Sequence, residues 1–217
     1  MDPPKNVLCV TDANYEEAAA AVRLMTTKHH RSRVYACDTE VADIDLARQS
    51  PVGHGRVICL SVYGGPGLDL SEGRAGVAQD VLWVDLSGER RGEMLAALGR
   101  FFGDEGVRKV WHNYGFDRHV LENEGVAVRG FAGDTLHMAR LLDTSRASFA
   151  LDSLTSDATL MPKGFRGKTD MKTLFSRNKV KKDGELGKAR WMPGVEALQA
   201  GPLTRSWRKM CSGIMIL

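Results

Sequence analysis

VYACDTEV, residues 34–41, is a β-prone apolar run with two acids, Asp38 and Glu40, in its second half. Residues two apart on a strand project from the same face, with Cα atoms about 6.6 Å apart. Carboxylates placed together repel each other unless a cation lies between them, and hard oxygen ligands suit magnesium or manganese. The run therefore indicates a divalent metal site on a strand. The alternative, which is common for a lone DxE pattern, is a pair of solvated acids at a strand end.

The segments on either side predict a mixed α/β fold. Residues 56–63 and 81–86 are further β-prone runs separated by a Gly-rich connection, so with residues 34–41 they predict an antiparallel meander. Helices and strands then alternate, which predicts parallel strands flanked by helices. Expected helices are residues 16–25, 91–102, 114–124, 134–142 and 148–156, and further strands are residues 6–10, 107–112 and 126–131.

Composition indicates one soluble globular domain. The chain has 217 residues, 43% hydrophobic and 26% charged, with no apolar run near the roughly 20 residues of a membrane helix. Four scattered cysteines suggest a reducing compartment and no zinc site. Residues 163–190 hold ten Lys/Arg and three acids, a net charge of +7. Because the chain totals +3, the remainder carries −4. This basic block is a candidate phosphate-binding surface, or a solvated linker.

A second polar element, HNYGFD, covers residues 112–117 at the predicted end of a strand and start of a helix. The four-residue spacing of Asn113 and Asp117 predicts that both lie on one helix face. Ligands of open α/β sheets usually bind at the carboxyl ends of strands. The simpler interpretation makes Asn113 an N-cap and Asp117 a favourable first-turn charge.

These motifs together resemble a known enzyme family. VYACDTEV, followed by KVWHNYGFDRHVLENEGV and GFAGDTLHMARLLD, is similar to the proofreading 3′-5′ exonuclease of family A DNA polymerases, of the organellar type found in plants, algae and protists. The similarity extends through SLTSD and MKTLF to KVKKDG. It implies a ribonuclease-H-like exonuclease fold of the DEDD type and an organellar location, in a mitochondrion or plastid.

The resemblance also implies roles for individual residues. Asp38 would bridge two divalent metal ions (Mg²⁺ or Mn²⁺), Glu40 would hold one and Asp117 the other. One ion would activate the attacking water, and the pair, about 4 Å apart, would clamp the attacking and leaving oxygens. The expected substrate-binding residues are Thr39, Ile44, Asn113, Phe116, Lys179, Lys181 and Lys182. Phe116 would stack on the terminal base above an apolar wedge, Ile44, although core packing is an equally simple role for Phe116.

Three further polar residues are interpreted as structural. Asp134 corresponds to an acid that is common in the family but is not a metal ligand, and its position predicts a helix N-cap. His112 and His137 have no matching ligand set around them in the sequence.

The family's third motif, YxxxD, which supplies the fourth carboxylate, is missing. After Glu196 the chain contains no Tyr, Asp or Glu. We therefore expect a strand-helix extension at residues 1–33, an incomplete exonuclease domain at 34–199 and an aberrant tail at 200–217. Such a truncated or frame-altered product would bind metal weakly, cleave very slowly and expose apolar surface.

The sequence thus predicts a metal-dependent 3′-5′ exonuclease acting on the single-stranded 3′ end of DNA, with a polymerase domain as a partner in full-length family proteins. Two alternatives stay open. One is a catalytically inactive module that still binds nucleic acid. The other is a ribonuclease-D-like enzyme that trims RNA 3′ ends. Base specificity would be low in each case, because backbone contacts and stacking do not read sequence.

Overall fold

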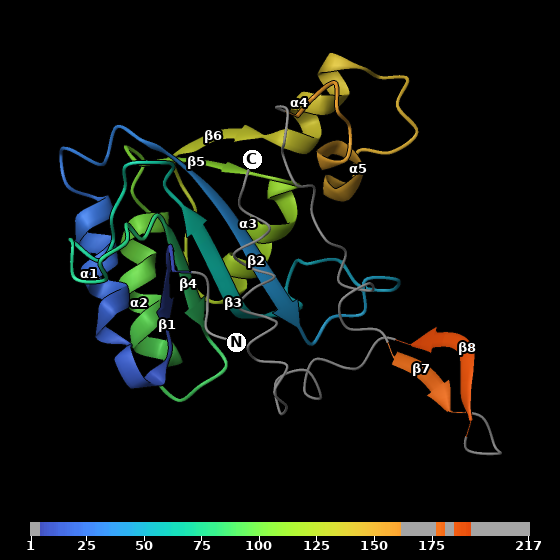
Figure 1. Cartoon of the computed structure of the whole chain (residues 1–217), viewed down its shortest axis with the longest axis horizontal. Helices are drawn as coiled ribbons and strands as arrows, with labels where there is room; N and C mark the ends of the chain where they lie inside the picture. The colour runs from blue at the N-terminus through green and yellow to red at the C-terminus, as the bar shows by residue number, and fades with distance from the viewer. Residues whose placement is uncertain (1–4, 162–176, 181–184, 192–217) are drawn as a thin grey trace.

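The computed structural model describes residues 5–161, 177–180 and 185–191 (Figure 1). Its helices are α1 (Glu16–Met25), α2 (Arg91–Phe102), α3 (Tyr114–Asn123), α4 (Thr135–Leu142) and α5 (Leu151–Thr155), with a 3-10 turn at Asp12–Asn14. Its strands are β1 (Val7–Val10), β2 (Val34–Ala42), β3 (Arg56–Tyr63), β4 (Val81–Asp85), β5 (Arg108–Trp111), β6 (Phe131–Asp134), β7 (Arg177–Val180) and β8 (Leu186–Trp191). None of the described helices is long and apolar enough to cross a membrane.

Six strands form one mixed sheet in the order β1-β4-β3-β2-β5-β6. Strands β2, β3 and β4 pair antiparallel, whereas β5 pairs parallel with both β2 and β6, and β1 pairs parallel with β4. The predicted order, an antiparallel meander followed by parallel strands, is confirmed. Because β2 has neighbours on both sides, its long apolar run is explained by burial within the sheet.

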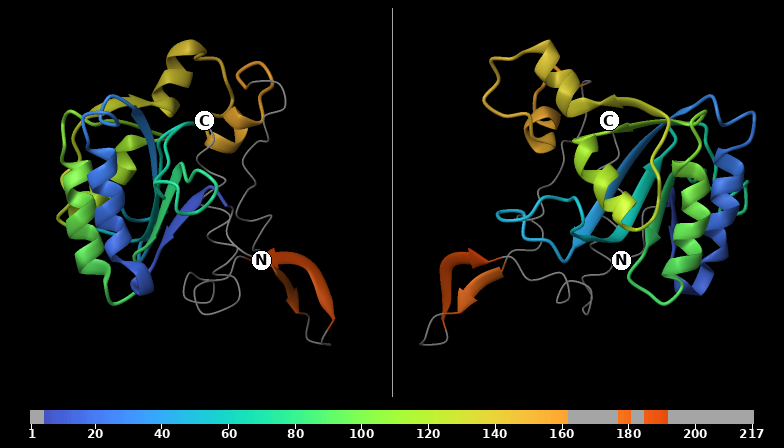
Figure 2. Two further views of the ribbon diagram at one scale, coloured as in Figure 1. Left: turned by 60° about the vertical axis from the view of Figure 1, so that its left-hand side comes forward. Right: turned by 180° about the vertical axis from the view of Figure 1, so that it is seen from behind.

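The two faces of β2 have different surroundings. Tyr35 is fully buried, and its hydroxyl donates to the carbonyl of Met25 in α1 at 3.3 Å while its ring meets Phe101 of α2 at 5.2 Å. Thr39, on the same face, contacts α3. Figure 2 shows α1, α2 and α3 on this side of the sheet. Asp38 and Glu40 alternate with these residues, so they project toward the opposite side.

Residues before β2 join the same sheet. β1 forms an edge strand, and the Asp12 carboxylate that follows it accepts hydrogen bonds from the backbone N–H groups of Glu89 and Arg90 at 2.8 and 3.0 Å, at the start of α2. The predicted extension therefore contributes an edge strand and a packed helix. The domain boundaries at residues 33 and 199 stay predictions.

Buried Lys109 anchors the amino end of β5. Its Nζ donates to the carbonyl oxygens of Asp104, Val107 and Arg129 at 2.9, 2.9 and 3.0 Å. An ammonium has three N–H groups, so each of these carbonyls receives one. Burial lowers the pKa of Lys109 to about 8. The lysine therefore serves a structural role at the end of the sheet away from Asp38.

Two elements differ from the expectation. The prediction of a strand at residues 126–130 is wrong, because Val126 N–H donates to Leu121 O and Arg129 N–H donates to Phe102 O. These two N–H groups bond to carbonyls near the carboxyl ends of α3 and α2, and β6 begins only at Phe131. The basic block contains an antiparallel hairpin, β7–β8, that periodicity did not indicate. The rest of that block, residues 163–176 and 181–184, and the expected tail at 200–217 lie outside the described residues.

Candidate active site

A β-bulge lies directly beyond the two acids of β2. Asp38 pairs with Ser61 and Glu40 with Cys59, but the next residue, Val41, pairs with Val57. One residue of β3, Ile58, is therefore left without a partner on β2. Bulges bend a strand and change the direction of nearby side chains. This one ends the regular part of β2 immediately after Glu40.

Asp117 of α3 meets β2 between the two acids. The pairing of β2 with β5 stops at Ala36 and Val110, so the flank of β2 beyond this point is open to α3. The Asp117 Oδ1 accepts hydrogen bonds from the backbone N–H of Thr39 at 3.0 Å and from its hydroxyl at 2.7 Å. Backbone pairing lost at the end of β5 is thus replaced by a carboxylate from the following helix.

This carboxyl is held in an unfavourable electrostatic environment. Asp117 is only 4% exposed. Burial raises its pKa well above the usual value, the charge of Asp38 raises the pKa further, and the two hydrogen bonds from Thr39 oppose the shift. A raised pKa between neighbouring carboxyls is typical of sites that bind a proton or a cation.

The start of α3 agrees in position with the simpler interpretation, an N-cap residue at Asn113 and an acid, Asp117, in the first turn. Asn113 lies at the N-cap position in a left-handed conformation, with φ 69° and ψ 50°, and its side chain makes no capping hydrogen bond. It therefore stands outside the helical repeat, so the prediction that it shares a helix face with Asp117 is wrong. Asn tolerates this conformation better than most residues.

A carboxylate from another element caps α3 instead. The buried Asp134 accepts hydrogen bonds from the backbone N–H groups of Asn113 at 3.0 Å and Tyr114 at 2.8 Å, and also from Leu136 of α4 at 2.9 Å. The predicted N-cap of α4 is confirmed. Sequence reasoning missed the link to α3, although the position of both segments at the ends of adjacent strands was a signal for it.

The two histidines each contact a polar side chain of a neighbouring residue. His112 Nδ1 lies 2.9 Å from the hydroxyl of Thr135, which donates to Trp111 O at 3.2 Å. His137 Nε2 lies 3.7 Å from Asp134 Oδ2 and is largely exposed. Both contacts belong to the junction of β5, β6 and α4.

The carboxyl end of α3 is anchored by residues that the sequence did not single out. Asn123 Nδ2 donates to the carbonyls of Pro51 and His54 at 2.8 and 2.7 Å, and its Oδ1 accepts from Gly53 N–H at 2.9 Å. Glu124 accepts from Val57 N–H at 3.0 Å and pairs with Arg91. The Asn123 bonds tie α3 to the connection between β2 and β3, and the Glu124 contacts tie it to β3 and α2.

The structure describes some of the remaining residues that were predicted to bind substrate. Phe116 is half-buried and packs against the apolar core. Ile44 is half-exposed in the connection after β2, beside Gly55. Lys179 belongs to β7, whereas Lys181 and Lys182 lie outside the described residues. Thr39 is buried beneath Asp117. The substrate-binding roles of these residues stay predictions.

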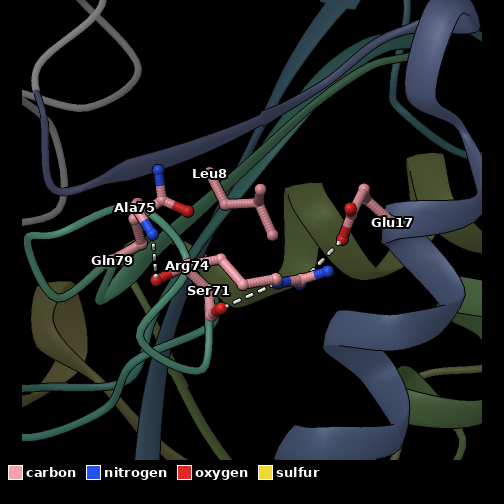
Figure 3. Close-up of a pocket in the computed structure, with 6 residues that line it drawn as sticks. All are labelled: Leu8, Glu17, Ser71, Arg74, Ala75 and Gln79. Atoms are coloured by element: carbon pink, nitrogen blue, oxygen red, sulfur yellow. Dashed lines mark hydrogen bonds and ion pairs between the residues drawn. The ribbon is translucent and has the colours of Figure 1, made fainter.

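A hollow of about 230 Å³ lies elsewhere, against β1 and α1 (Figure 3). The connection between β3 and β4 lines it, at the end of the sheet opposite to Glu40. Arg74 lines the hollow, and its guanidinium pairs with Glu17 at 3.4 Å and donates to Ser71 O at 2.8 Å. The charge in this hollow is therefore satisfied internally.

The acids of the site fit a divalent cation by donor type. Asp38 and Glu40 share one face, and Asp117 is close enough for the charge of Asp38 to raise its pKa. Within the described segments, however, no three His, Cys, Asp or Glu side chains already converge on a point. Both bonds from Thr39 end on one oxygen of Asp117, Oδ1.

This sheet order, with α3 following β5, is that of an α/β fold of the ribonuclease-H-like class. The fold is similar to the crystal structure of Trypanosoma brucei RNase D, with a TM-score of 0.53 at 15% identity, covering 97% of this chain and 64% of that one. This likeness concerns the fold alone.

Residues 13–172 match the 3′-5′ exonuclease family, and the chain belongs to that family of hydrolases. It is 43% identical over 179 residues to DNA polymerase I A, chloroplastic/mitochondrial, of Arabidopsis thaliana, covering 78% of this chain and 17% of the relative. It is 45% identical over 197 residues to DNA polymerase I A, chloroplastic, of Oryza sativa subsp. japonica, covering 86% and 18%. The resemblance inferred from the motifs is confirmed.

The chain thus spans less than a fifth of the length of these curated relatives. The names of the relatives support an organellar location. Enzymes of this exonuclease family act on nucleic acid with divalent metal ions, which agrees with the donor types in the site.

Proposed function

We propose that this chain is a proofreading-type exonuclease unit that removes nucleotides from the single-stranded 3′ end of DNA with two divalent cations. The observation that carries the proposal is the meeting of Asp117 with Thr39 between Asp38 and Glu40. On this proposal the three acids, which come from two elements, would act together at the carboxyl end of the central strand, where ligands of α/β sheets bind.

Each acid has a separate role in the proposal. Asp38 would contact both cations, Glu40 would hold one and Asp117 the other. When bound, the cations supply charge neutralisation for the phosphate and activation of the attacking water. Thr39 orients Asp117 through its two hydrogen bonds, and Asn113 and Phe116, at the first turn of α3, would contact the terminal nucleotide.

Similarity to the relatives favours DNA over RNA as the proposed substrate of this chain. Chains 41–45% identical to this one are named DNA polymerases, whereas the likeness to RNase D is 15% identical. The polymerase partner is proposed on the same ground. Lys179, Lys181 and Lys182 would contribute phosphate contacts from the basic block.

Slow cleavage is proposed because only three acids, Asp38, Glu40 and Asp117, are assigned to the two cations. A binding module without catalysis is the second candidate function, and the absence of three converged ligands among the described residues favours it.

Digestion of a 5′-labelled single-stranded oligonucleotide, as DNA and as RNA, tests the proposal. The full chain is compared with Asp38→Ala/Glu40→Ala, with Mg²⁺ or Mn²⁺. We expect a ladder that shortens from the 3′ end of DNA and is absent from the double variant. Binding without a ladder would instead establish the inactive module, and faster trimming of RNA would contradict the DNA assignment.

A further inference from the structure

We propose that Asp134 is a positioning residue for the active site, because its carboxylate sets the place of the first turn of α3. The inference rests on the proposed function of Asp38, Glu40 and Asp117. Asp134 comes from the end of β6 and touches none of these three acids through a described hydrogen bond. Its effect on them is transmitted by the backbone of α3.

The first turn of α3 depends on this contact. The first N–H groups of a helix have no partner within the helix. Asn113 provides no side-chain cap, so the N–H groups of Asn113 and Tyr114 are satisfied by Asp134. The two bonds use both carboxylate oxygens, Oδ1 for Asn113 and Oδ2 for Tyr114, which fixes the helix start in two directions.

The contact is rigid because Asp134 is itself fixed. Its exposed fraction is 3%, and its Oδ1 also accepts from Leu136 N–H in α4. One carboxylate therefore caps two helices and joins the ends of two adjacent parallel strands, since Trp111 pairs with Asp134. A negative charge at both helix starts is favourable as well.

The position of Asp117 follows from this anchor. Asp117 lies three residues after Tyr114, about 4.5 Å along the helix axis. Its carboxylate oxygen sits 2.7 Å from the hydroxyl of Thr39. A tilt or slip of the first turn would move that oxygen relative to the face of β2 that carries Asp38 and Glu40. Groups that orient metal ligands affect metal affinity by 10- to 100-fold.

The serine variant Asp134→Ser separates this role from ordinary helix capping. Serine is a good N-cap, so α4 keeps a partner for Leu136 N–H. Its side chain is one atom shorter and has one oxygen, so the bonds to α3 are lost. A matched control is Asp69→Ser. Asp69 also accepts several backbone N–H bonds, from Ser71, Gly73 and Gln79, but it lies far from α3 in the connection between β3 and β4.

Two measurements on the full chain decide the question: Mn²⁺ titration and amide hydrogen exchange. For Asp134→Ser we expect about a tenfold loss of Mn²⁺ affinity and faster exchange at Asn113 and Tyr114. Asp69→Ser should leave both unchanged. Equal Mn²⁺ affinity in the wild type and Asp134→Ser would overturn the proposal.

A failure of the proposed function would look different. If the wild-type chain bound no Mn²⁺, the metal site would be refuted, and exchange alone would decide whether Asp134 holds α3. Equal exchange in all three proteins would then overturn the positioning role. Should Asp134→Ser not fold, Asp134→Asn replaces it, because the amide keeps the shape and places an N–H group where one carboxylate oxygen was.

Discussion

Asp117 shows the conflict between folding and binding at a single residue. Its carboxyl is buried against β2, beside the charge of Asp38, and two hydrogen bonds from Thr39 compensate only in part. Burying an acid without a full set of partners reduces the stability of the folded state. On the proposed function, a cation bound by Asp117 would offset this loss of stability.

Asp117→Asn should therefore stabilise the chain without metal. The amide oxygen can accept both bonds from Thr39, and the side chain cannot ionise. The folded-state pKa of Asp117 lies above its unfolded value, so its contribution to the free energy of unfolding falls as pH rises through the window between the two. We expect the variant to be more stable than the wild type at pH 7 in EDTA, because burying a neutral amide costs less free energy than burying an ionised carboxylate.

Thermal unfolding at several pH values checks this expectation. The difference should shrink below the unfolded pKa, where the wild-type carboxyl is protonated in both states. Mn²⁺ should raise the melting temperature of the wild type and not of Asp117→Asn. A variant that is less stable than the wild type at pH 7 in EDTA would show that the ionised carboxyl is well compensated.

At the scale of elements, the sequence predicted most of the architecture. Periodicity identified α1, α2 and β3 to the residue and the order of antiparallel and parallel strands. The DxE pattern placed Asp38 and Glu40 on one face of a strand. These features depend on local alternation of apolar and polar residues, which a single sequence displays directly.

The parts that could not be predicted depend on contacts between distant segments. The bond of Asp117 to Thr39 joins residues 78 positions apart, and the bond of Asp134 to Tyr114 spans 20. The sequence predicted a strand at residues 126–130, but N–H groups of this segment donate to carbonyls near the ends of α2 and α3. Neither a propensity nor a spacing indicates which partner a backbone N–H will find in the folded chain.

Gly130 offers a test of this segment. Its φ is +67°, and a Cβ built there would lie 2.1 Å from Val107 O and 3.0 Å from Asp104 O. Gly130→Ala should destabilise the chain by about 3 kcal/mol, through a backbone clash added to strain. Gly125 has φ +74° with open space around its Cβ position, so Gly125→Ala should cost only about 1 kcal/mol. Denaturant unfolding compares the two, and equal losses would mean that the segment moves aside without cost.

Along the whole sequence, positive charge is concentrated in one segment, the basic block at residues 163–190. Residues 163–190 carry +7 and the remainder −4. An exposed apolar set on β6 and α4 adds a second surface feature, formed by Phe131, Met138, Leu141 and Leu142. Exposed apolar patches commonly bind other molecules or lower solubility, so this edge is where we expect the poor solubility anticipated from the sequence to originate.

The basic block should control the salt dependence of nucleic-acid binding. For single strands, log K falls with log salt by about 0.7 for each phosphate contact. Replacing Lys179, Lys181 and Lys182 by Ala should therefore weaken binding of a single-stranded oligonucleotide in EDTA and make the slope shallower by about 2. Fluorescence anisotropy from low to moderate salt measures both quantities.

The control must remove the same charge from another surface. Arg23 and Arg100 are exposed on α1 and α2, and Lys28 is exposed three residues after the end of α1. Replacing these three by Ala changes the net charge equally, so it should lower affinity slightly without changing the slope. Equal slopes for the two triple variants would mean that the lysines act only through total charge. A difference confined to the Lys179, Lys181 and Lys182 variant would place phosphate groups on the basic block, because counterions are released only where phosphates are neutralised.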